Sequence, residues 1–232
     1  MNQNLQSVTA DHGYGVSSDA QRNRVLRNTY WLLALSMVPT VLGAWVGMAT
    51  GLTQAMSPGI GLVVFLGGAF GFMFAIEKTK NSAAGVPVLL AFTFFMGLML
   101  SRLLGTVLGL ANGASLVMMA FAGTGAIFLG MATLSSTIKR DLSSMGKWLF
   151  IGMIMLLVAG IANFFIQSGA LMITLAVLAI GIFSAFILHD LKRVQDGLET
   201  NYITATLGVY LSIYNVFQSL LALLGIFGGN EE

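Results

Sequence analysis

The stretch that decides the fold is residues 201–227, which read NYITATLGVYLSIYNVFQSLLALLGIF. It contains no charged residue and exceeds the roughly 20 residues that a helix needs to cross a bilayer. Small and polar residues recur in it at alternating steps of four and three, which places them on one side of a helix. We call this stripe the polar seam, and its members are Asn201, Ala205, Gly208, Ser212, Asn215, Ser219 and Ala222.

A helix with such a stripe cannot turn it toward lipid, because each unpaired polar group in hydrocarbon costs several kcal/mol. We therefore expect this helix at the centre of a bundle. Its second face carries Tyr202, Tyr210, Tyr214 and Phe217. Two roles for Ser212 and Asn215 remain open: they bridge helices structurally, or they line a pathway.

The rest of the chain is equally apolar. Of its 232 residues, 56% are hydrophobic and 9% charged, whereas a soluble domain averages about 25% charged residues. The composition therefore predicts an all-α membrane protein, a bundle of seven transmembrane helices with the last helix central. The expected spans are 29–50, 59–76, 84–108, 113–136, 146–167, 169–188 and 202–227.

The two ends of the chain are polar. Residues 1–28 contain too few apolar residues for a core and predict a flexible cytoplasmic tail, followed by the membrane domain at 29–227 and a short C-terminal tail at 228–232. The first apolar run is longer than the roughly 7–15 apolar residues of a signal peptide, so we do not expect one.

Lysine and arginine predict the orientation, because they accumulate in cytoplasmic loops. Ten of the eleven basic residues precede the first span or lie in alternate loops, and the other side has only Arg102. The N-terminus is therefore expected in the cytoplasm and the C-terminus outside. Arg102 interrupts the third span together with Ser101, so this helix either ends there or bends.

Glycines and other small residues are expected at helix contacts, because helices in lipid associate through close packing. The first span offers Gly43 and Gly47, and the second offers Gly67 and Gly71. The short break at 167–169 predicts a tight hairpin between the fifth and sixth spans.

Ionisable residues within spans are functional candidates. Asp190 and its neighbour His189 lie at the cytoplasmic end of the sixth span and are candidates for sensing protons or binding a cation such as calcium. The alternative is an interfacial cluster in which Lys192, Arg193 or Lys139 neutralises Asp190. Arg102 is a possible gating charge.

Enzymatic chemistry is not expected. The last span offers no carboxylate to pair with Asp190, and no histidine lies inside a span to activate a serine. The chain contains no cysteine, and no cluster of metal ligands or phosphate-binding loop is evident. We therefore expect no cofactor, no metal site other than a calcium ion at Asp190, and no nucleic-acid partner.

Several motifs resemble the Bax inhibitor-one family, and within it the bacterial YccA-like branch. The likeness covers residues 22–227 and is most specific near the last span. The matching residues are Val25-Leu26-Arg27-Asn28-Thr29-Tyr30, Lys78-Thr79, Glu199-Thr200-Asn201-Tyr202-Ile203, Tyr210, Ser212, Tyr214-Asn215, Phe217, Ser219-Leu220-Leu221 and Leu224-Gly225.

The resemblance implies a seven-helix bundle with one of two activities. Some members are proton-sensitive calcium leak channels gated by an aspartate pair, of which Asp190 matches the first and Ser212 the position of the second. An acidic residue of the family's third helix corresponds to Met96. Serine and methionine carry no charge, so these departures disfavour the leak.

The YccA-like branch is associated with FtsH, a membrane-anchored ATP-dependent protease, as substrate and inhibitor. The resemblance thus implies a modulator of this protease in the bacterial inner membrane, with lipid and FtsH as partners and the N-terminal tail as the handle for degradation. The alternative is a pH-sensitive calcium or cation leak that uses Asp190.

Overall fold

The computed structural model describes the backbone of residues 11–228 and the side chains of residues 19–228. In this region the chain consists of helices joined by short loops. Within it, seven helices are long and apolar enough to cross a membrane, as expected. The helices are α1 (Asp11–Thr50), α2 (Leu52–Ala55), α3 (Pro58–Thr79), α4 (Gly85–Leu108), α5 (Gly113–Thr137), α6 (Met145–Ile166), α7 (Gly169–Gln195) and α8 (Tyr202–Gly228).

The expected spans match these helices closely, with two extensions and one addition. α1 begins before residue 29, and α7 continues beyond residue 188, so that His189 and Asp190 lie inside a helix. The four-residue α2 was not expected, because it is too short to produce a periodic pattern. α4 runs through Ser101 and Arg102 to Leu108, so of the two alternatives for this point, the one in which the helix ends there is excluded.

The N-terminal tail, expected at 1–28, is helical from Asp11 and continuous with the first span. Extending an existing helix avoids the cost of nucleation, so polar residues without a core of their own can join it. The flexibility expected for residues 1–10, and the short C-terminal tail expected at 228–232 apart from Gly228, concern residues outside the described region.

The hairpin between α6 and α7 is as tight as expected. Gln167 adopts a left-handed conformation (φ 56°), and its N–H donates to the carbonyl of Asn163 at 2.7 Å. The hydroxyl of Ser168 accepts a hydrogen bond from the N–H of Leu171 and caps α7. Two residues, Gln167 and Ser168, therefore suffice to reverse the chain.

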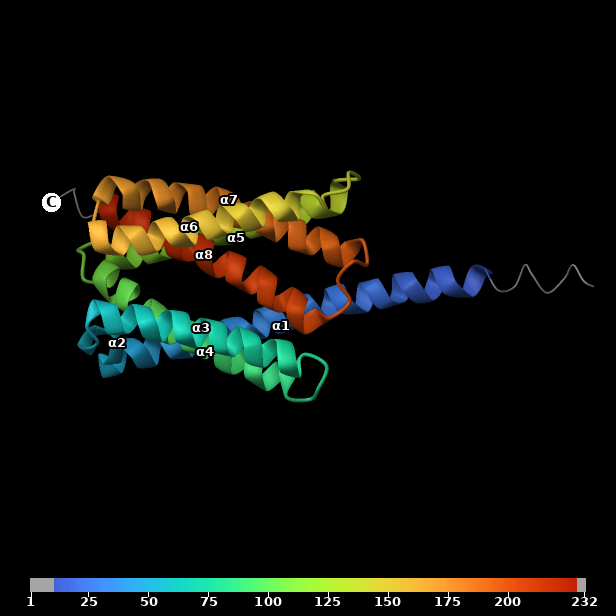
Figure 1. Ribbon diagram of the computed structural model, residues 1–232, viewed down its shortest axis with the longest axis horizontal. Coiled ribbons are helices and arrows are strands. Elements are labelled where there is room, and N and C mark those ends of the chain that lie inside the picture. The colour runs from blue at the N-terminus through green and yellow to red at the C-terminus, as the bar shows by residue number, and fades with distance from the viewer. Residues whose placement is uncertain (1–10, 229–232) are drawn as a thin grey trace, which may run out of the picture.

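α8 occupies the centre of the bundle, which confirms the expectation from its polar seam. Figure 1 shows it crossing between one group, α1, α3 and α4, and a second, α5, α6 and α7. It packs against α1, α4, α5 and α7 and touches α3. Because α1 and α4 pack extensively and α6 packs on α7, α8 joins the two groups.

The helix connections divide the bundle into two ends (Figure 1). One end contains the start of α1 and the α3–α4, α5–α6 and α7–α8 loops, and we call it the basic end. We call the other end of the bundle the opposite end. Ten of the eleven lysines and arginines belong to the basic end, and Arg102 belongs to the opposite end. The side of the membrane that each end faces stays a prediction.

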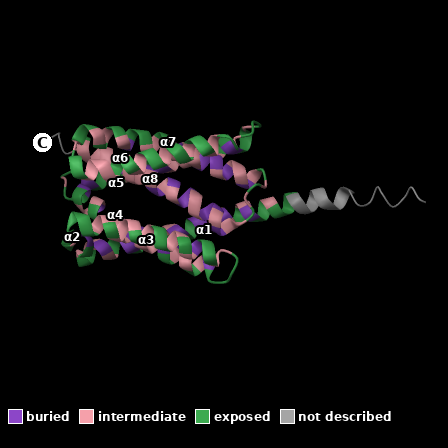
Figure 2. Ribbon diagram, in the orientation of Figure 1, coloured by how far each residue is buried: buried purple, intermediate pink, exposed green. Residues whose placement is uncertain are grey.

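The outer surface is apolar, as a lipid-facing surface must be. α6 has no buried residue along its length, and Figure 2 shows exposed and half-buried positions along it. Trp31, Trp148 and Phe165 are each more than 70% exposed. Side chains of this size would be a liability in water but are stable against acyl chains.

Glycine allows α1 and α4 to touch backbone to backbone. A Cβ atom on Gly97 of α4 would collide with the carbonyl oxygen of Thr40, and one on Gly43 of α1 with that of Phe94. A Cβ atom on Gly47 would instead collide with the side chain of Ser101. The expected packing role is confirmed for Gly43 and Gly47.

The corresponding expectation for α3 is wrong. No described atom lies within 4 Å of a Cβ built on Gly67 or Gly71, and both positions are exposed. α3 instead approaches α4 through Gly68, which faces the ring of Phe95. Small residues thus mark a helix contact only where the partner helix happens to pass.

Candidate functional site

His189 and Asp190 form a contact near the basic end of α7. Nδ1 of His189 lies 3.0 Å from Oδ1 of Asp190, within hydrogen-bonding distance. The histidine is buried, and the side chain of Asp190 is 18% exposed. A carboxylate and an imidazole at this distance can share or exchange a proton.

Two glycines make room for this pair. A Cβ on Gly146, in the first turn of α6, would lie 2.7 Å from Nε2 of His189. A Cβ on Gly208 of α8 would lie 2.8 Å from Oδ2 of Asp190. The pair therefore lies between α6 and α8, and any larger residue at either glycine would displace it. Of the two, Gly146 was not singled out from the sequence.

Lys192, one of the three basic residues that could have neutralised Asp190, pairs with another carboxylate. Nζ of Lys192 lies 2.6 Å from Oδ1 of Asp196, one turn along α7. Among the described side chains, the ion pairs include none between Asp190 and a lysine or arginine. No described ion pair therefore supports the alternative of an interfacial cluster. The side chain that contacts Asp190 is His189.

Thr204 adds an unusual polar atom to the same side of α8. Its hydroxyl oxygen is buried and finds no hydrogen-bond partner among the described residues. It lies four residues, one helical turn, before Gly208, which faces Asp190. The sequence could not single it out, because a threonine near a helix start usually bonds its own backbone.

The polar seam of α8 serves three purposes. Asn201 caps the helix, since its side-chain oxygen accepts from the N–H groups of Ile203 and Thr204, and its amide donates to the carbonyl of Lys80 in the α3–α4 loop. Ser212 and Asn215 donate to the carbonyls four residues before them. Gly208 admits Asp190.

The hydrogen bonds of Ser212 and Asn215 bear on the two roles left open for them. Both side chains satisfy themselves on their own helix, and the described hydrogen bonds include none from either residue to another helix. Ser219 is half-buried on the same side. A surface of small side chains that form hydrogen bonds within their own helix allows another helix to pack closely. A role of Ser212 and Asn215 in lining a pathway stays a prediction.

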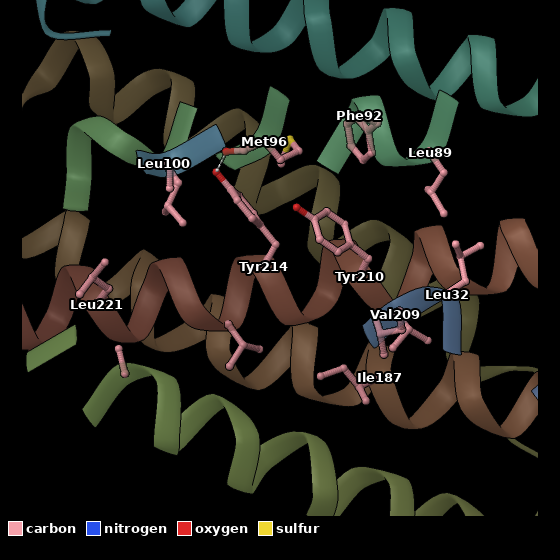
Figure 3. Close-up of a cluster of buried hydrophobic side chains, with 14 of the residues drawn as sticks. Leu32, Leu89, Phe92, Met96, Leu100, Ile187, Val209, Tyr210, Tyr214 and Leu221 are labelled. Carbon is pink, nitrogen blue, oxygen red and sulfur yellow. Dashed lines mark hydrogen bonds between the residues drawn. The ribbon is translucent and has the colours of Figure 1, made fainter. Parts of the chain in front are cut away.

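The tyrosine face of α8 makes hydrogen bonds to two neighbouring helices, and Figure 3 shows the one between Tyr214 and Met96. The hydroxyl of Tyr210 lies 2.9 Å from that of Thr40 on α1, and the hydroxyl of Tyr214 donates to the carbonyl of Met96 on α4 at 3.3 Å. Both rings belong to the buried core. Position 96, which the resemblance associates with an acid, therefore contributes its backbone here.

Arg102 lies far from the other candidates, at the opposite end of the bundle. It is exposed on α4, and the side chains that the structure describes include no ion-pair partner for it. The predicted site residues thus form two separate groups, one around Asp190 and one around Arg102.

Metal binding receives little geometric support. Among the described residues, no three His, Cys, Asp or Glu side chains gather in a group that would hold a metal ion. Calcium takes six to eight oxygen ligands, so the carboxylate of Asp190 would supply only a small part of its shell.

Comparisons with known proteins agree with this architecture. The sequence profile described as "Inhibitor of apoptosis-promoting Bax1" matches residues 22–229. The "Modulator of FtsH protease YccA" of Escherichia coli (strain K12) is 37% identical over 203 residues, which cover 88% of this chain and 90% of the relative.

Two further relatives match over similar lengths. An "Uncharacterized membrane protein" of Vibrio cholerae is 37% identical over 211 residues, 91% of this chain and 93% of the relative. A Pseudomonas aeruginosa protein without an assigned role is 37% identical over 216 residues, 93% and 95% of the two chains. With a profile match and three relatives spanning nearly its whole length, this chain belongs to the Bax inhibitor-1 family, and YccA is among its close relatives.

Proposed function

We propose that the protein is a multi-pass modulator, at once substrate and inhibitor, of an FtsH-type membrane-anchored ATP-dependent protease. The observation that carries the proposal is the similarity, along 88% of the chain, to a relative named as a modulator of FtsH protease. The same similarity favours the bacterial inner membrane, since the relative in a second Escherichia coli strain is named an inner membrane protein.

The shape of α1 is consistent with a handle for such a protease. Its first part projects beyond the other helices at the basic end (Figure 1). Side chains at Asp19, Gln21, Asn23 and Arg24 are exposed. A protease that begins at the N-terminus would therefore meet accessible chain first.

The helix becomes anchored a few residues later. Arg22 donates to the carbonyl of Gln195 at 3.3 Å, and Val25 is buried against Val194 and Ala205. Extraction beyond this point must break contacts with α7 and α8 and then the backbone contact with α4. Segments with many buried contacts open rarely, so the bundle would resist pulling and occupy the protease.

Deleting residues 2–20 should lengthen the half-life of the protein in cells several-fold, because the accessible segment is lost while the Val25 contacts remain. The measurement is a pulse–chase in cells with and without the protease. A shuffled segment of equal length should restore rapid decay. Equal decay of truncated and intact protein would show that the segment is not the handle.

A second candidate function, a pH-sensitive calcium leak, rests on the contact between His189 and Asp190. Here Asp190→Asn should change calcium entry into vesicles that contain the purified protein, because it removes the ionisable carboxylate. Asp196→Asn, which alters an exposed carboxylate paired with Lys192, is the matched control. Flux no greater than in empty vesicles between about pH 5 and pH 8 excludes the leak.

A further inference from the structure

The end of α7 leaves one backbone carbonyl that its own turn does not satisfy. The last carbonyls of a helix lack N–H partners within the helix. In the turn that follows α7, the N–H groups of residues 196–199 return to carbonyls of residues 192–194. The carbonyl of Gln195 receives none of these bonds, and its described partner is Nη1 of Arg22 on α1, at 3.3 Å. Arg22 therefore caps α7 from a distant part of the chain.

The charge of Arg22 suits this position. The C-terminus of a helix carries a partial negative charge, so a guanidinium is favoured there. Arg22 also forms an ion pair with Asp19, one turn earlier on α1. Its side chain is 41% exposed, so water competes for the bond to Gln195 and the bond can break without burying a charge.

Gly197 allows the side chain of Arg22 to lie across the turn. It adopts a left-handed backbone conformation (φ 75°), which favours glycine. A Cβ atom on Gly197 would lie 3.1 Å from Cδ of Arg22. The turn after α7 is therefore shaped to receive the stem of this arginine.

A small apolar cluster adds a second attachment. Val25 is buried with Val194 of α7 and Ala205 of α8, in a group separate from the main core. The next firmly held residue is Thr29, which is completely buried and whose carbonyl accepts from the hydroxyl of Thr206 at 3.4 Å. Between residues 19 and 28, the described hydrogen bonds include one to another helix, that of Arg22.

The contact between the first part of α1 and the α7–α8 turn is incompletely packed. A cleft of about 350 Å³ opens between them. It is lined on α1 by Gln21, Arg22 and Val25, and on the turn by Asp196, Gly197, Glu199 and Thr200. Because few atoms hold this segment, it can detach while the close contact between α1 and α4 remains intact.

We propose that Arg22 and the end of α7 form a latch, which holds the first part of α1 on the bundle and limits the length of N-terminal chain that a protease can engage. This inference rests on the proposed function and adds a regulatory element to it. With the latch closed, the accessible chain ends near Gln21. With the latch open, residues 22–28 join it, because a helical segment with few tertiary contacts frays from its free end.

The latch bears on the two roles of a protein that is at once substrate and inhibitor. An open latch favours degradation, because a longer accessible segment gives the protease more chain to hold. A closed latch favours inhibition, because the protease then meets the anchored bundle sooner.

The first measurement is hydrogen–deuterium exchange of the intact protein in lipid nanodiscs, without any protease. Arg22→Ala should speed amide exchange in residues 19–28 about three- to tenfold, the effect of losing one hydrogen bond. Arg22→Lys should exchange at an intermediate rate, because it keeps the charge and a donor. Arg24→Ala is the matched control: Arg24 is exposed on the same helix, and the described hydrogen bonds and ion pairs include none from it.

The second measurement is the half-life of the same variants in cells that contain the protease. Arg22→Ala should shorten the half-life roughly twofold or more, because the open latch lengthens the accessible segment. Arg24→Ala should decay like the intact protein.

Equal exchange in Arg22→Ala and Arg24→Ala would overturn the proposal, since the cap on α7 would then hold nothing. Faster exchange in Arg22→Ala with an unchanged half-life would overturn it as well, because the latch would not limit the protease. If the protease degrades neither the intact protein nor any variant, the proposed function fails instead. Faster exchange in Arg22→Ala would in that case still establish the latch on α1.

Discussion

Gly97→Leu should leave little folded protein in the membrane, and what remains should unfold at a markedly lower temperature. A Cβ at this position would collide with the carbonyl oxygen of Thr40 and lie 3.0 Å from the N–H nitrogen of Ala44. These are backbone atoms of α1, so no side-chain rotation can relieve the collision. The two helices must separate.

The expected cost follows from the extent of this contact. α1 and α4 pack along much of their length, and Gly43 and Gly47 on the facing helix are equally close. Overpacking a protein interior typically lowers the free energy of unfolding by about 1–3 kcal/mol. For a collision with backbone atoms we expect a loss at or above the upper end of this range. In a chain of this size, 3 kcal/mol lowers the melting temperature by roughly 6–12 °C.

Gly71→Leu is the matched control. It introduces the same side chain into a helix interior, at an exposed site with no described atom within 4 Å of the new Cβ. The measurement is the melting temperature of both variants in one detergent, together with their yields from membranes. Equal melting temperatures for the two variants would mean that α1 and α4 do not meet as closely as the structure places them.

The sequence predicts the helices of this protein far better than it predicts their contacts. Hydropathy alone locates the spans, because each must match the thickness of the bilayer. It cannot distinguish Gly43 from Gly71, since both belong to small-residue patterns on apolar helices. Only the first meets a neighbouring backbone, and that depends on where α4 crosses.

The candidate site shows the same limit. The sequence indicates Asp190 and His189 by charge, and the polar seam correctly predicts the central position of α8. It does not reveal that Gly146 and Gly208 make room for the pair, because a glycine has no side chain from which a contact could be predicted. Nor does it show that the tyrosines, and not the seam, bond to α1 and α4.

Phe92→Ala should be the most damaging truncation of a side chain in the core. Phe92 is completely buried on α4, and its ring contacts those of Tyr210 on α8 and Phe72 on α3, with centroids 6.1 and 5.9 Å apart. It therefore lies where three helices meet. Removing the ring leaves a cavity that rigid helices cannot close.

The loss of stability caused by Phe92→Ala distinguishes the contribution of packing from that of the hydrophobic effect. In a soluble protein, Phe→Ala costs about 3–5 kcal/mol, which includes the gain from removing the ring from water. A side chain in lipid is already surrounded by hydrocarbon, so this part is absent and the loss of van der Waals contacts remains. We expect about 2–4 kcal/mol, below or within the soluble range.

Phe121→Ala provides the comparison, because Phe121 is 72% exposed on α5 and its ring contacts mostly lipid. It should change the free energy of unfolding little, since acyl chains occupy the space that the ring leaves. Reversible unfolding in mixed micelles measures both variants, and an apolar gas such as xenon should restabilise Phe92→Ala alone by filling its cavity. Equal losses for the two variants would mean that burial inside the bundle contributes nothing beyond contact with lipid, and that forces other than core packing hold α3, α4 and α8 together.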